Sequence, residues 1–339
     1  MISIVMPSYN SAEFIEQAIE SVRAQTFPHF ELLVCDDGST DGTLDIVRRL
    51  MGQDDRIRLL LNNCRNISLN CNIGLREARY PWIARLDADD VMHPNRLELQ
   101  MKAAEQDPSV VLWGSHARLV NRKGRPLRTL RTGPATQEEF ESKRATGGML
   151  VIQGPTVMFR RDLALEIGGY DPFFNSAEDL ELLHRLVAFG PARVLPLALT
   201  DYRVHGGSVT SGKAAHQIRL IRYIEARNRA VLAGCAICPP EEFMRALDSA
   251  PVHVRLLEWI DGMARQNYRN ASIHNAEKRT FRAVLCLTAA LSLNPFFSLP
   301  RLGKRIGRSL AVRSRATLHS AGRRILGAVH AGGNGGPAH

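Results

Sequence analysis

The pattern of apolar and polar positions predicts alternating strands and helices over the first 115 residues. Short apolar runs rich in Ile, Val and Leu indicate strands, and apolar residues that recur every three or four positions indicate helices. The predicted strands are 2–6, 31–35, 57–61, 82–86 and 110–113, and the predicted helices are 12–25, 43–51, 69–79 and 94–106. This alternation predicts an α/β fold, with a mostly parallel sheet flanked by helices and ligands bound beyond the carboxyl ends of the strands.

The pattern changes after residue 115. It predicts a hairpin over 117–131, strands at 156–159 and 197–204, and helices at 136–144, 162–167 and 178–189. Beyond Gly212 the chain reads as helical until its Gly-rich end. We therefore expect an α/β domain at 1–212, with halves 1–115 and 116–212, a helical region at 213–330 and a disordered end at 331–339.

The charge of the chain is unevenly distributed. Its 339 residues include 44 Lys+Arg and 34 Asp+Glu, a net charge of +10, which is typical of proteins that bind nucleic acids or membranes. However, 11 of the basic residues and none of the acidic ones follow Glu277, so the rest is close to neutral. A near-neutral body, 6% aromatic residues and no reader motif argue against a nucleic-acid partner.

The six cysteines do not form a disulfide framework or a zinc motif. Cys235 and Cys238 make one C-x-x-C pair without a second, and small buried apolar residues are the simpler interpretation. The apolar start, 1–6, lacks basic flanks and stops at Pro7, so it is not a secretion signal. These features predict a cytoplasmic protein.

The first of three acidic clusters, 36–41, follows a predicted strand and precedes a helix. A carboxylate there can accept a hydrogen bond from the N–H edge of a nucleobase. For this loop alone, an Asx turn with Asp41 capping the next helix is the competing interpretation.

The second acidic cluster is Asp87-Ala88-Asp89-Asp90, directly after the strand 82–86. Three carboxylates within four residues repel one another unless a cation neutralises them, and Mg²⁺ or Mn²⁺ favours such oxygen ligands. The alternative is a solvated turn with Asp90 near the start of the next helix.

The third acidic cluster is Glu178-Asp179, in the first turn of the helix 178–189. Ser176 to Asp179 also fits a capping box, in which Asp179 only stabilises the helix. Alongside two other acidic loops, a general base at the rim of the site is the favoured interpretation.

In order and spacing, these segments resemble family 2 of the glycosyltransferases, the inverting nucleotide-sugar enzymes with a GT-A (Rossmann-like) fold. The resemblance covers about residues 1 to 210. Its matching segments are Val5-Met6-Pro7-Ser8-Tyr9-Asn10, Gln25-Thr26-Phe27, the loop 36–41, Asn72-Ile73-Gly74, Leu86-Asp87-Ala88-Asp89-Asp90, Gly168-Gly169-Tyr170-Asp171, Glu178-Asp179 and Tyr202-Arg203-Val204-His205.

The resemblance implies a role for each site residue. Asp179 would deprotonate the acceptor hydroxyl, and the metal, Mn²⁺ or Mg²⁺, would bind Asp89 and assist the departing diphosphate. His205 would reach the metal or the diphosphate; a structural histidine is the alternative. The implied nucleotide-sugar residues, with Tyr9 stacking on the base and Asp37 accepting from it, are Pro7, Tyr9, Asn10, Asp37, Arg65 and Asp87.

Two positions depart from the family pattern. Family members often carry an arginine before the Asn-x-Gly segment. Arg65 is the nearest candidate here, but its distance in sequence from Asn72 does not establish that it corresponds to that arginine. Gly154 stands where many relatives carry a histidine, so the resemblance does not define the details of the acceptor pocket.

The basic C-terminal segment, 299–324, has apolar residues at helical spacing among arginines and lysines. Such a helix can lie on an anionic membrane, with about 1 kcal/mol per basic residue close to the surface. The alternative is an appendage that packs on the catalytic domain or a second subunit, so an oligomer is possible. The apolar run 281–293 is too short to span a bilayer.

The sequence therefore predicts an inverting, metal-dependent glycosyltransferase for a surface polysaccharide or glycolipid. Its donor would be a nucleotide sugar, most simply a UDP-sugar, and its acceptor a saccharide or a lipid-linked hydroxyl. It would be cytoplasmic, with possible peripheral attachment to the inner face of the cell membrane. Because clustered carboxylates also occur in metal-dependent nucleases and nucleotidyltransferases, such a nucleotide-processing enzyme is the alternative.

Overall fold

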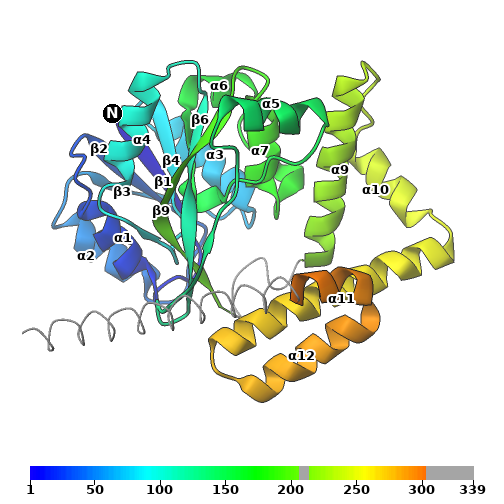
Figure 1. The fold of residues 1–339 in the computed structure, drawn as a ribbon. Helices are drawn as coiled ribbons and strands as arrows, with labels where there is room; N and C mark the ends of the chain where they lie inside the picture. The colour runs from blue at the N-terminus through cyan, green and yellow to red at the C-terminus, as the bar shows by residue number, and fades with distance from the viewer. Residues whose placement is uncertain (206–213, 303–339) are drawn as a thin grey trace, which may run out of the picture.

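The computed structural model describes residues 1–205 and 214–302. Within these ranges the chain forms one sheet with helices on both faces, followed by a run of helices (Figure 1). The strands are β1 (Ile2–Ser8), β2 (Phe30–Asp36), β3 (Ile57–Leu61), β4 (Trp82–Arg85), β5 (Val91–Met92), β6 (Leu112–Asn121), β7 (Pro126–Leu130), β8 (Met158–Arg160) and β9 (Ala192–Val204). The helices are α1 (Ile15–Arg23), α2 (Thr43–Met51), α3 (Ile67–Glu77), α4 (Arg96–Gln106), α5 (Gln137–Ala145), α6 (Arg161–Glu166), α7 (Glu178–Leu186), α9 (Ala214–Leu232), α10 (Pro240–Asp248), α11 (Val252–Ala276) and α12 (Thr280–Leu293), with 3₁₀ turns η1 (Gly154–Thr156) and η2 (Pro172–Phe174).

The strand order explains how loops distant in sequence come together. The order is β3-β2-β1-β4-β8-β6-β9-β5, with β7 beside β6. Strands β3, β2, β1 and β4 are parallel neighbours, so the loops after β1, β2 and β4 leave the sheet at one edge. Strands β6 and β9 are also parallel, whereas β8, β7 and β5 pair antiparallel. The predicted α/β class is confirmed, with a mixed sheet in its second half.

The core has one apolar layer on each face of the sheet. Alternate residues of a strand point to opposite faces, so Ile4 of β1 packs with α1, α2 and α4, whereas Val5 packs with α3 and α7. All seven residues of β1 and of β2 are buried. A strand covered on both faces loses the apolar–polar alternation of a surface strand, which accounts for the continuous apolar runs in the sequence.

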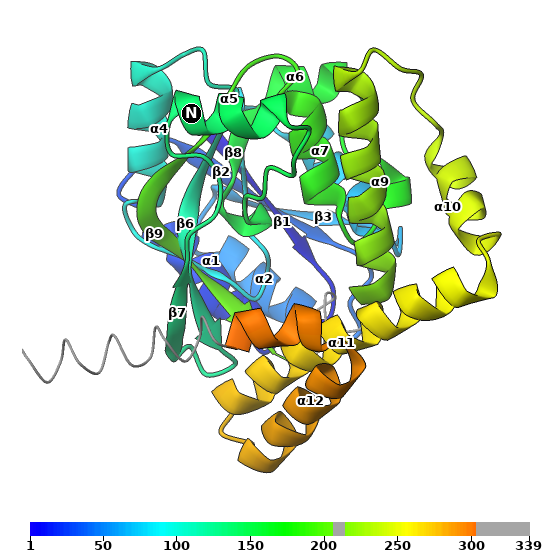
Figure 2. The same ribbon diagram turned by 45° about the vertical axis from the view of Figure 1, so that its right-hand side comes forward.

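The C-terminal helices pack on this α/β unit through α9. Leu220, Tyr223 and Ile224 of α9 share an apolar cluster with Phe174 and Leu180. Next to that cluster, the buried carboxylate of Glu181 accepts a hydrogen bond from Arg227 at 2.6 Å. Helices α11 and α12 then lie together at the end of the molecule opposite the N-terminus (Figures 1 and 2).

Several predicted elements differ in detail. The two-residue strand β5 was not predicted, and β6 and β9 are longer than expected because they pair over ten positions. The predicted disorder of 331–339 and most of the basic segment 299–324 lie outside the described residues.

Within the described residues, no helix is both long and apolar enough to cross a bilayer. The segment 281–293 belongs to α12, a helix of 14 residues.

His184 links α7 to α9 as a neutral side chain, and this predicts acid sensitivity. Its Nε2 accepts a hydrogen bond from the Leu150 N–H at 3.1 Å, and its Nδ1 lies 3.0 Å from Asn228 Nδ2. Burial lowers the pKa of His184 from 6.5 to about 4. Between these values the unfolded chain binds the proton and the folded chain does not, so acid favours unfolding. We expect the free energy of unfolding to fall by up to about 3 kcal/mol as the pH drops through this window.

Urea denaturation of the wild type and of His184→Gln, at pH 7.5 and pH 5, measures this effect. The variant should lose less stability on acidification than the wild type, because glutamine does not titrate. His29→Gln, at an exposed position, is the control and should behave as the wild type. An equal loss in the wild type and His184→Gln would assign the acid sensitivity to other groups.

Candidate active site

The candidate active site lies at the carboxyl ends of β1, β2 and β4. There the structure gathers Tyr9 and Asn10 after β1, the loop 36–41 after β2 and the loop 87–90 after β4. The sheet is continuous at this edge, since the Asp37 N–H donates to Ser8 O at 2.9 Å. The topology thus brings most of the predicted site residues to one face.

In the loop 36–41, Asp36 and Asp37 have different surroundings. Asp36 is fully buried, and its Oδ1 accepts hydrogen bonds from the Gly38 and Ser39 N–H groups at 3.1 and 2.8 Å. This is the Asx turn that the sequence left open. Asp37 Oδ1 accepts from the Cys64 and Arg65 N–H groups at 2.5 and 3.0 Å. Among the described residues Oδ2 of Asp37 has no hydrogen-bond partner, which leaves it available to a ligand.

The competing interpretation of Asp41 as the helix cap is wrong, because the N-cap of α2 is Gly42, although Asp41 does bind the first turn. Its carboxylate accepts from the N–H of Thr43, the first residue of α2, at 3.0 Å, and from the N–H of Ala12 at 3.1 Å. Asp41 therefore stabilises the start of α2 and ties it to the loop before α1.

Two residues of the predicted nucleotide pocket have left-handed backbone. Asn10 has φ 48° and Arg65 has φ 50°, a region that non-glycine residues seldom adopt. Asn10 is held there because its Oδ1 accepts from the Thr40 N–H and its own N–H donates to Ser39 Oγ, both at 2.8 Å. The neighbouring Tyr9 is 61% exposed, whereas Pro7 is buried in β1. A large aromatic face is thus presented beside a fixed polar loop.

The loop 87–90 directs its three carboxylates to three different partners. Asp87 Oδ1 lies 3.0 Å from Arg85 Nη2, and Asp89 Oδ2 lies 2.9 Å from His205 Nε2. Asp90 is fully buried, and its Oδ1 accepts from the Arg203 N–H at 2.7 Å. The alternative of a solvated turn is therefore wrong for Asp90, which joins this loop to β9.

Glu178 and Asp179 begin α7 and face the same site. The capping box suggested by Ser176 does not form: the N-cap is Ala177, and Ser176 Oγ is buried without a partner among the described residues. Asp179 Oδ1 accepts from the Leu180 N–H at 2.7 Å. Its Oδ2 approaches Gly154 so closely that a Cβ there would lie 2.5 Å away. Glycine at 154 thus allows the position that Asp179 adopts.

Burial and mutual repulsion weaken the acidity of these carboxyl groups. Burial raises the pKa of Asp87 and of Asp179, and the Arg85 guanidinium opposes both shifts. Burial and the Asp179 charge raise the pKa of Glu178 to about 7. Burial, with the field of Asp87, Asp89, Asp90 and Asp179, raises the pKa of Tyr202. The acidic segments 87–90 and 178–179 therefore share one electrostatic environment, which is typical of catalytic sites.

The donor set fits a divalent cation. Among the described residues no group of three or more His, Cys, Asp and Glu side chains has metal-site geometry. Asp89 and His205 nevertheless place a carboxylate oxygen and an imidazole nitrogen next to each other, and both are ligands that Mn²⁺ accepts. Two protein ligands leave the remaining positions for diphosphate oxygens and water.

Other residues of the resembling motifs have structural roles. The Asn72 side chain pairs with the backbone of Tyr170, donating to its C=O and accepting from its N–H at 2.7 Å each. Gly169, at φ 72°, leaves the space for that amide, since a Cβ would lie 2.3 Å from Asn72 Oδ1. Gln25 likewise ties α1 to α4, because its Oε1 accepts from the Leu97 N–H at 3.1 Å.

Sequence reasoning missed Arg85, Arg96 and Tyr202. The buried guanidinium of Arg96 donates to the backbone carbonyls of Arg85, Pro155 and Val157, and burial lowers its pKa to about 9. It thereby fixes the end of β4 against η1, next to Gly154. The available signal was an arginine inside the apolar run 82–86.

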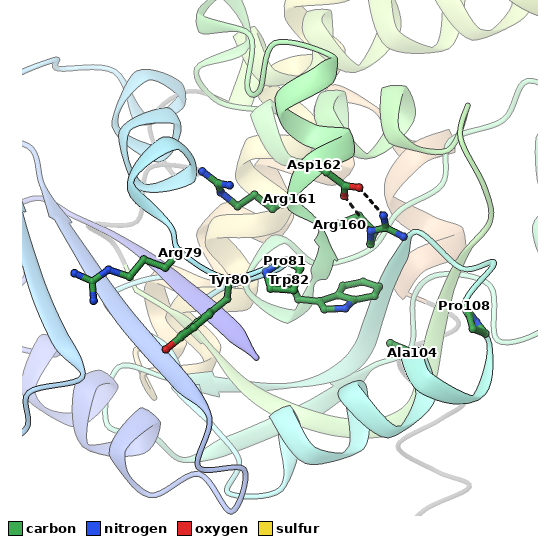
Figure 3. Close-up of a pocket in the computed structure, with 9 residues that line it drawn as sticks. All are labelled: Arg79, Tyr80, Pro81, Trp82, Ala104, Pro108, Arg160, Arg161 and Asp162. Carbon is green, nitrogen blue, oxygen red and sulfur yellow. Dashed lines mark hydrogen bonds and ion pairs between the residues drawn. The ribbon is translucent and has the colours of Figure 1, made fainter.

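A separate pocket lies at the opposite end of β4 (Figure 3). It has a volume of about 560 Å³, and Asp162 neutralises Arg160 there with a hydrogen bond from Nε at 2.9 Å. Arg161 is turned to the backbone carbonyls of Leu75 and Arg76. Because these guanidinium groups do not converge on the pocket, we do not assign it to the site. Its lining residues are Arg79, Tyr80, Pro81, Trp82, Ala104, Pro108, Arg160, Arg161 and Asp162.

Comparison with known proteins identifies the family that the chain resembles. The family model "Glycosyl transferase family 2" matches residues 3–168. The chain is 28% identical over 227 residues to the O-antigen biosynthesis glycosyltransferase WbnJ of Escherichia coli, covering 64% of this chain and 84% of that protein. It is 30% identical over 210 residues to the chondroitin synthase of Pasteurella multocida, covering 62% of this chain and 21% of the synthase. The chain thus spans about a fifth of the length of that synthase.

Two solved structures share the fold. Staphylococcus aureus TarS 1–349 in complex with UDP-GlcNAc has a TM-score of 0.55 and 19% identity, covering 86% of this chain and 91% of that one. The mannosyltransferase PcManGT from Pyrobaculum calidifontis, in complex with GDP-Man and Mn²⁺, has a TM-score of 0.51 and 19% identity, covering 91% and 80%. The fold of the chain is therefore of the GT-A class. Over residues 3–168, the chain matches glycosyltransferase family 2.

Proposed function

We propose that this protein is an inverting, divalent-metal-dependent glycosyltransferase that moves a sugar from a nucleotide sugar, most simply a UDP-sugar, to a hydroxyl group. The acceptor is a saccharide or a lipid-linked saccharide in the synthesis of a surface polysaccharide or glycolipid. The observation that carries the proposal is the convergence of the loop 87–90, Glu178-Asp179 and His205 at the carboxyl ends of the strands. The synthases and biosynthetic enzymes among the relatives support the class of product.

Each candidate site residue has its own role in this proposed reaction. Tyr9, Pro7 and Asn10 surround the nucleotide base, with Asp37 accepting from its N–H edge and Arg65 beside it. Asp87 faces the ribose or the sugar. Asp89 and His205 would hold the metal, which would supply positive charge to offset that of the departing diphosphate. Asp179 removes the proton of the acceptor hydroxyl as its oxygen attacks the anomeric carbon from the face opposite the leaving group.

A ligand panel tests the choice of donor. We expect UDP-glucose, UDP-galactose, UDP-GlcNAc or UDP-glucuronate to raise the thermal unfolding midpoint with Mn²⁺ present, because a ligand that binds only the folded chain stabilises it. At a concentration 100 times its Kd, one such ligand adds about 2.7 kcal/mol. GDP-mannose is the comparison in this panel, because its nucleotide differs from that of the UDP-sugars. No stabilisation by any nucleotide sugar, with or without Mn²⁺, would contradict the proposal.

We further propose that the basic C-terminal segment docks the enzyme on an anionic membrane, as predicted for 299–324. Residues 303–324 lie outside the described part of the chain, but the preceding helix supports the idea. Phe281, at the start of α12, is 81% exposed, and its sequence neighbours Lys278, Arg279 and Arg282 are exposed as well. Phe296, beyond the other end of α12, is 91% exposed. Exposed apolar side chains among basic residues suit the headgroup region of a bilayer.

Sedimentation with vesicles tests this docking. We expect the full chain to pellet with phosphatidylglycerol-containing vesicles, and the variant with Phe281→Ser and Phe296→Ser to lose most of that binding. Leu197→Ser, which removes an apolar side chain 49% exposed on β9, is the control. Equal pelleting of all three proteins would show that these phenylalanines do not contribute to membrane binding.

A further inference from the structure

Arg85 is a buried charged residue at the end of an otherwise apolar strand. It is 2% exposed. Its Nη2 lies 3.0 Å from Asp87 Oδ1 and 3.3 Å from Glu178 Oε1, and its Nε donates to the same Asp87 oxygen at 3.1 Å. One guanidinium group therefore joins the acidic loop after β4 to the start of α7, although Arg85 and Glu178 are 93 residues apart.

The backbone of Arg85 is fixed from both sides. Its N–H donates to Val157 O at 3.0 Å, and its C=O accepts from the buried Arg96 Nη2 at 3.1 Å. The Tyr170 ring centroid lies 5.8 Å from the guanidinium carbon. The sheet and Arg96 therefore hold the backbone from which the guanidinium group reaches the two carboxylates.

Arg85 also supplies the positive charge that these carboxyl groups share. Its field lowers the pKa of Asp87, Glu178 and Asp179, each of which burial raises. Asp87, Glu178 and Tyr202 are the other titratable groups that interact with Asp179. Nη1 of Arg85 is buried and has no hydrogen-bond partner among the described residues. The contacts of the guanidinium with the two acidic segments are therefore made by Nε and Nη2.

We propose that Arg85 is a positioning residue that holds the donor-side carboxylate Asp87 and the base-bearing start of α7 in register, so that the donor and the attacking hydroxyl meet. This inference rests on the proposed function, since it assumes that Asp179 is the base. Arg85 acts through Asp87 and Glu178 and does not contact the reacting atoms. Its planar fork can engage both carboxylates at once, which an ammonium group does poorly.

The variants Arg85→Met and Arg85→Lys test this role, with UDP release from the active UDP-sugar of the panel as the assay. A displacement of about 1 Å costs about 100-fold in rate. We therefore expect Arg85→Met to lower kcat about 100-fold, with a less than tenfold rise in the donor KM. The acid limb of its kcat profile should move to higher pH, because Asp179 loses its cation. Arg85→Lys should recover part of kcat and return the acid limb toward that of the wild type.

Arg58→Met is the matched control. Arg58 pairs with the buried Glu31 at 2.9 Å, away from the site, so this variant should lose stability without a change in the kcat profile. The double variant Arg85→Met with Glu178→Gln separates a folding defect from a loss of positioning. It removes the Arg85 charge together with the Glu178 charge that Arg85 pairs with. The double variant should regain thermal stability over Arg85→Met, yet keep the low kcat.

Two results would overturn the inference. One is an Arg85→Met enzyme with the kcat and pH profile of the wild type. The other is a double variant that regains kcat together with stability, because Arg85 would then serve folding alone. The wild type measured in the same assay tests the proposed function separately. An inactive wild type contradicts that function, whereas an active wild type with an equally active Arg85→Met contradicts only the role of Arg85.

Discussion

Asp179→Asn is expected to lose sugar transfer while it keeps the nucleotide sugar bound. Asparagine preserves the shape of the side chain and can still accept from the Leu180 N–H, so the start of α7 should remain in place. An amide cannot take the proton of the acceptor hydroxyl. Since a positioned general base contributes about 10²–10⁴-fold, we expect kcat to fall about 1000-fold. Steady-state turnover, with donor binding measured by calorimetry, separates the two effects.

The pH dependence of the wild type supports the same test. Burial raises the pKa of Asp179 above its ordinary value of 3.8, and the ionised form is the base. Activity should therefore decline as the pH falls through that raised pKa. Asp162→Asn, which removes a carboxylate paired with Arg160 at the far end of β4, should keep normal turnover. An Asp179→Asn enzyme with wild-type turnover would exclude Asp179 as the base.

Local pattern predicted the elements of residues 1–115 well. The helix 43–51 and the strand 57–61 have the bounds that the structure shows, because each is set by near neighbours in sequence. Strands β1 and β2 are buried on both faces, and their apolar runs are short and contain β-branched residues, which favours strands over a buried helix. β5 has only two residues and is stabilised by pairing with β9, which local pattern cannot reveal.

The partners of the acidic residues could not be predicted because they are distant in sequence. The sequence located the loop 36–41 but did not distinguish Asp36, which closes an Asx turn, from Asp37, which holds the backbone at 64–65. It also could not show that Asp90 is buried against the Arg203 N–H. Each of these contacts joins different elements of the sheet, so only the tertiary structure fixes it.

In the structure, some residues of the resembling motifs face the site, and others hold the backbone around it in place. Asn72 and Gly169 meet each other and so fix the backbone at Tyr170, near the Arg85 guanidinium. Gly154 leaves space for the Asp179 carboxylate, since a Cβ there would lie 2.5 Å from its Oδ2. Residue type alone does not distinguish these roles, because glycine and asparagine act here through the volume and hydrogen bonds of distant neighbours.

Asp89→Ala is expected to abolish the metal-supported binding of the nucleotide sugar. The change removes the carboxylate that lies 2.9 Å from His205 and leaves an imidazole as the remaining proposed ligand. We expect the affinity for UDP with saturating Mn²⁺ to fall at least about 100-fold, or about 2.7 kcal/mol, and the metal-free affinity to change little. His205→Gln should show a smaller loss of the same kind, because the charged ligand remains. The matched control is Asp45→Asn, which changes an exposed carboxylate on α2. Calorimetric titration of UDP with and without Mn²⁺ measures both affinities. If Mn²⁺ still raises the UDP affinity of Asp89→Ala as it does for the wild type, the metal is bound by residues other than Asp89.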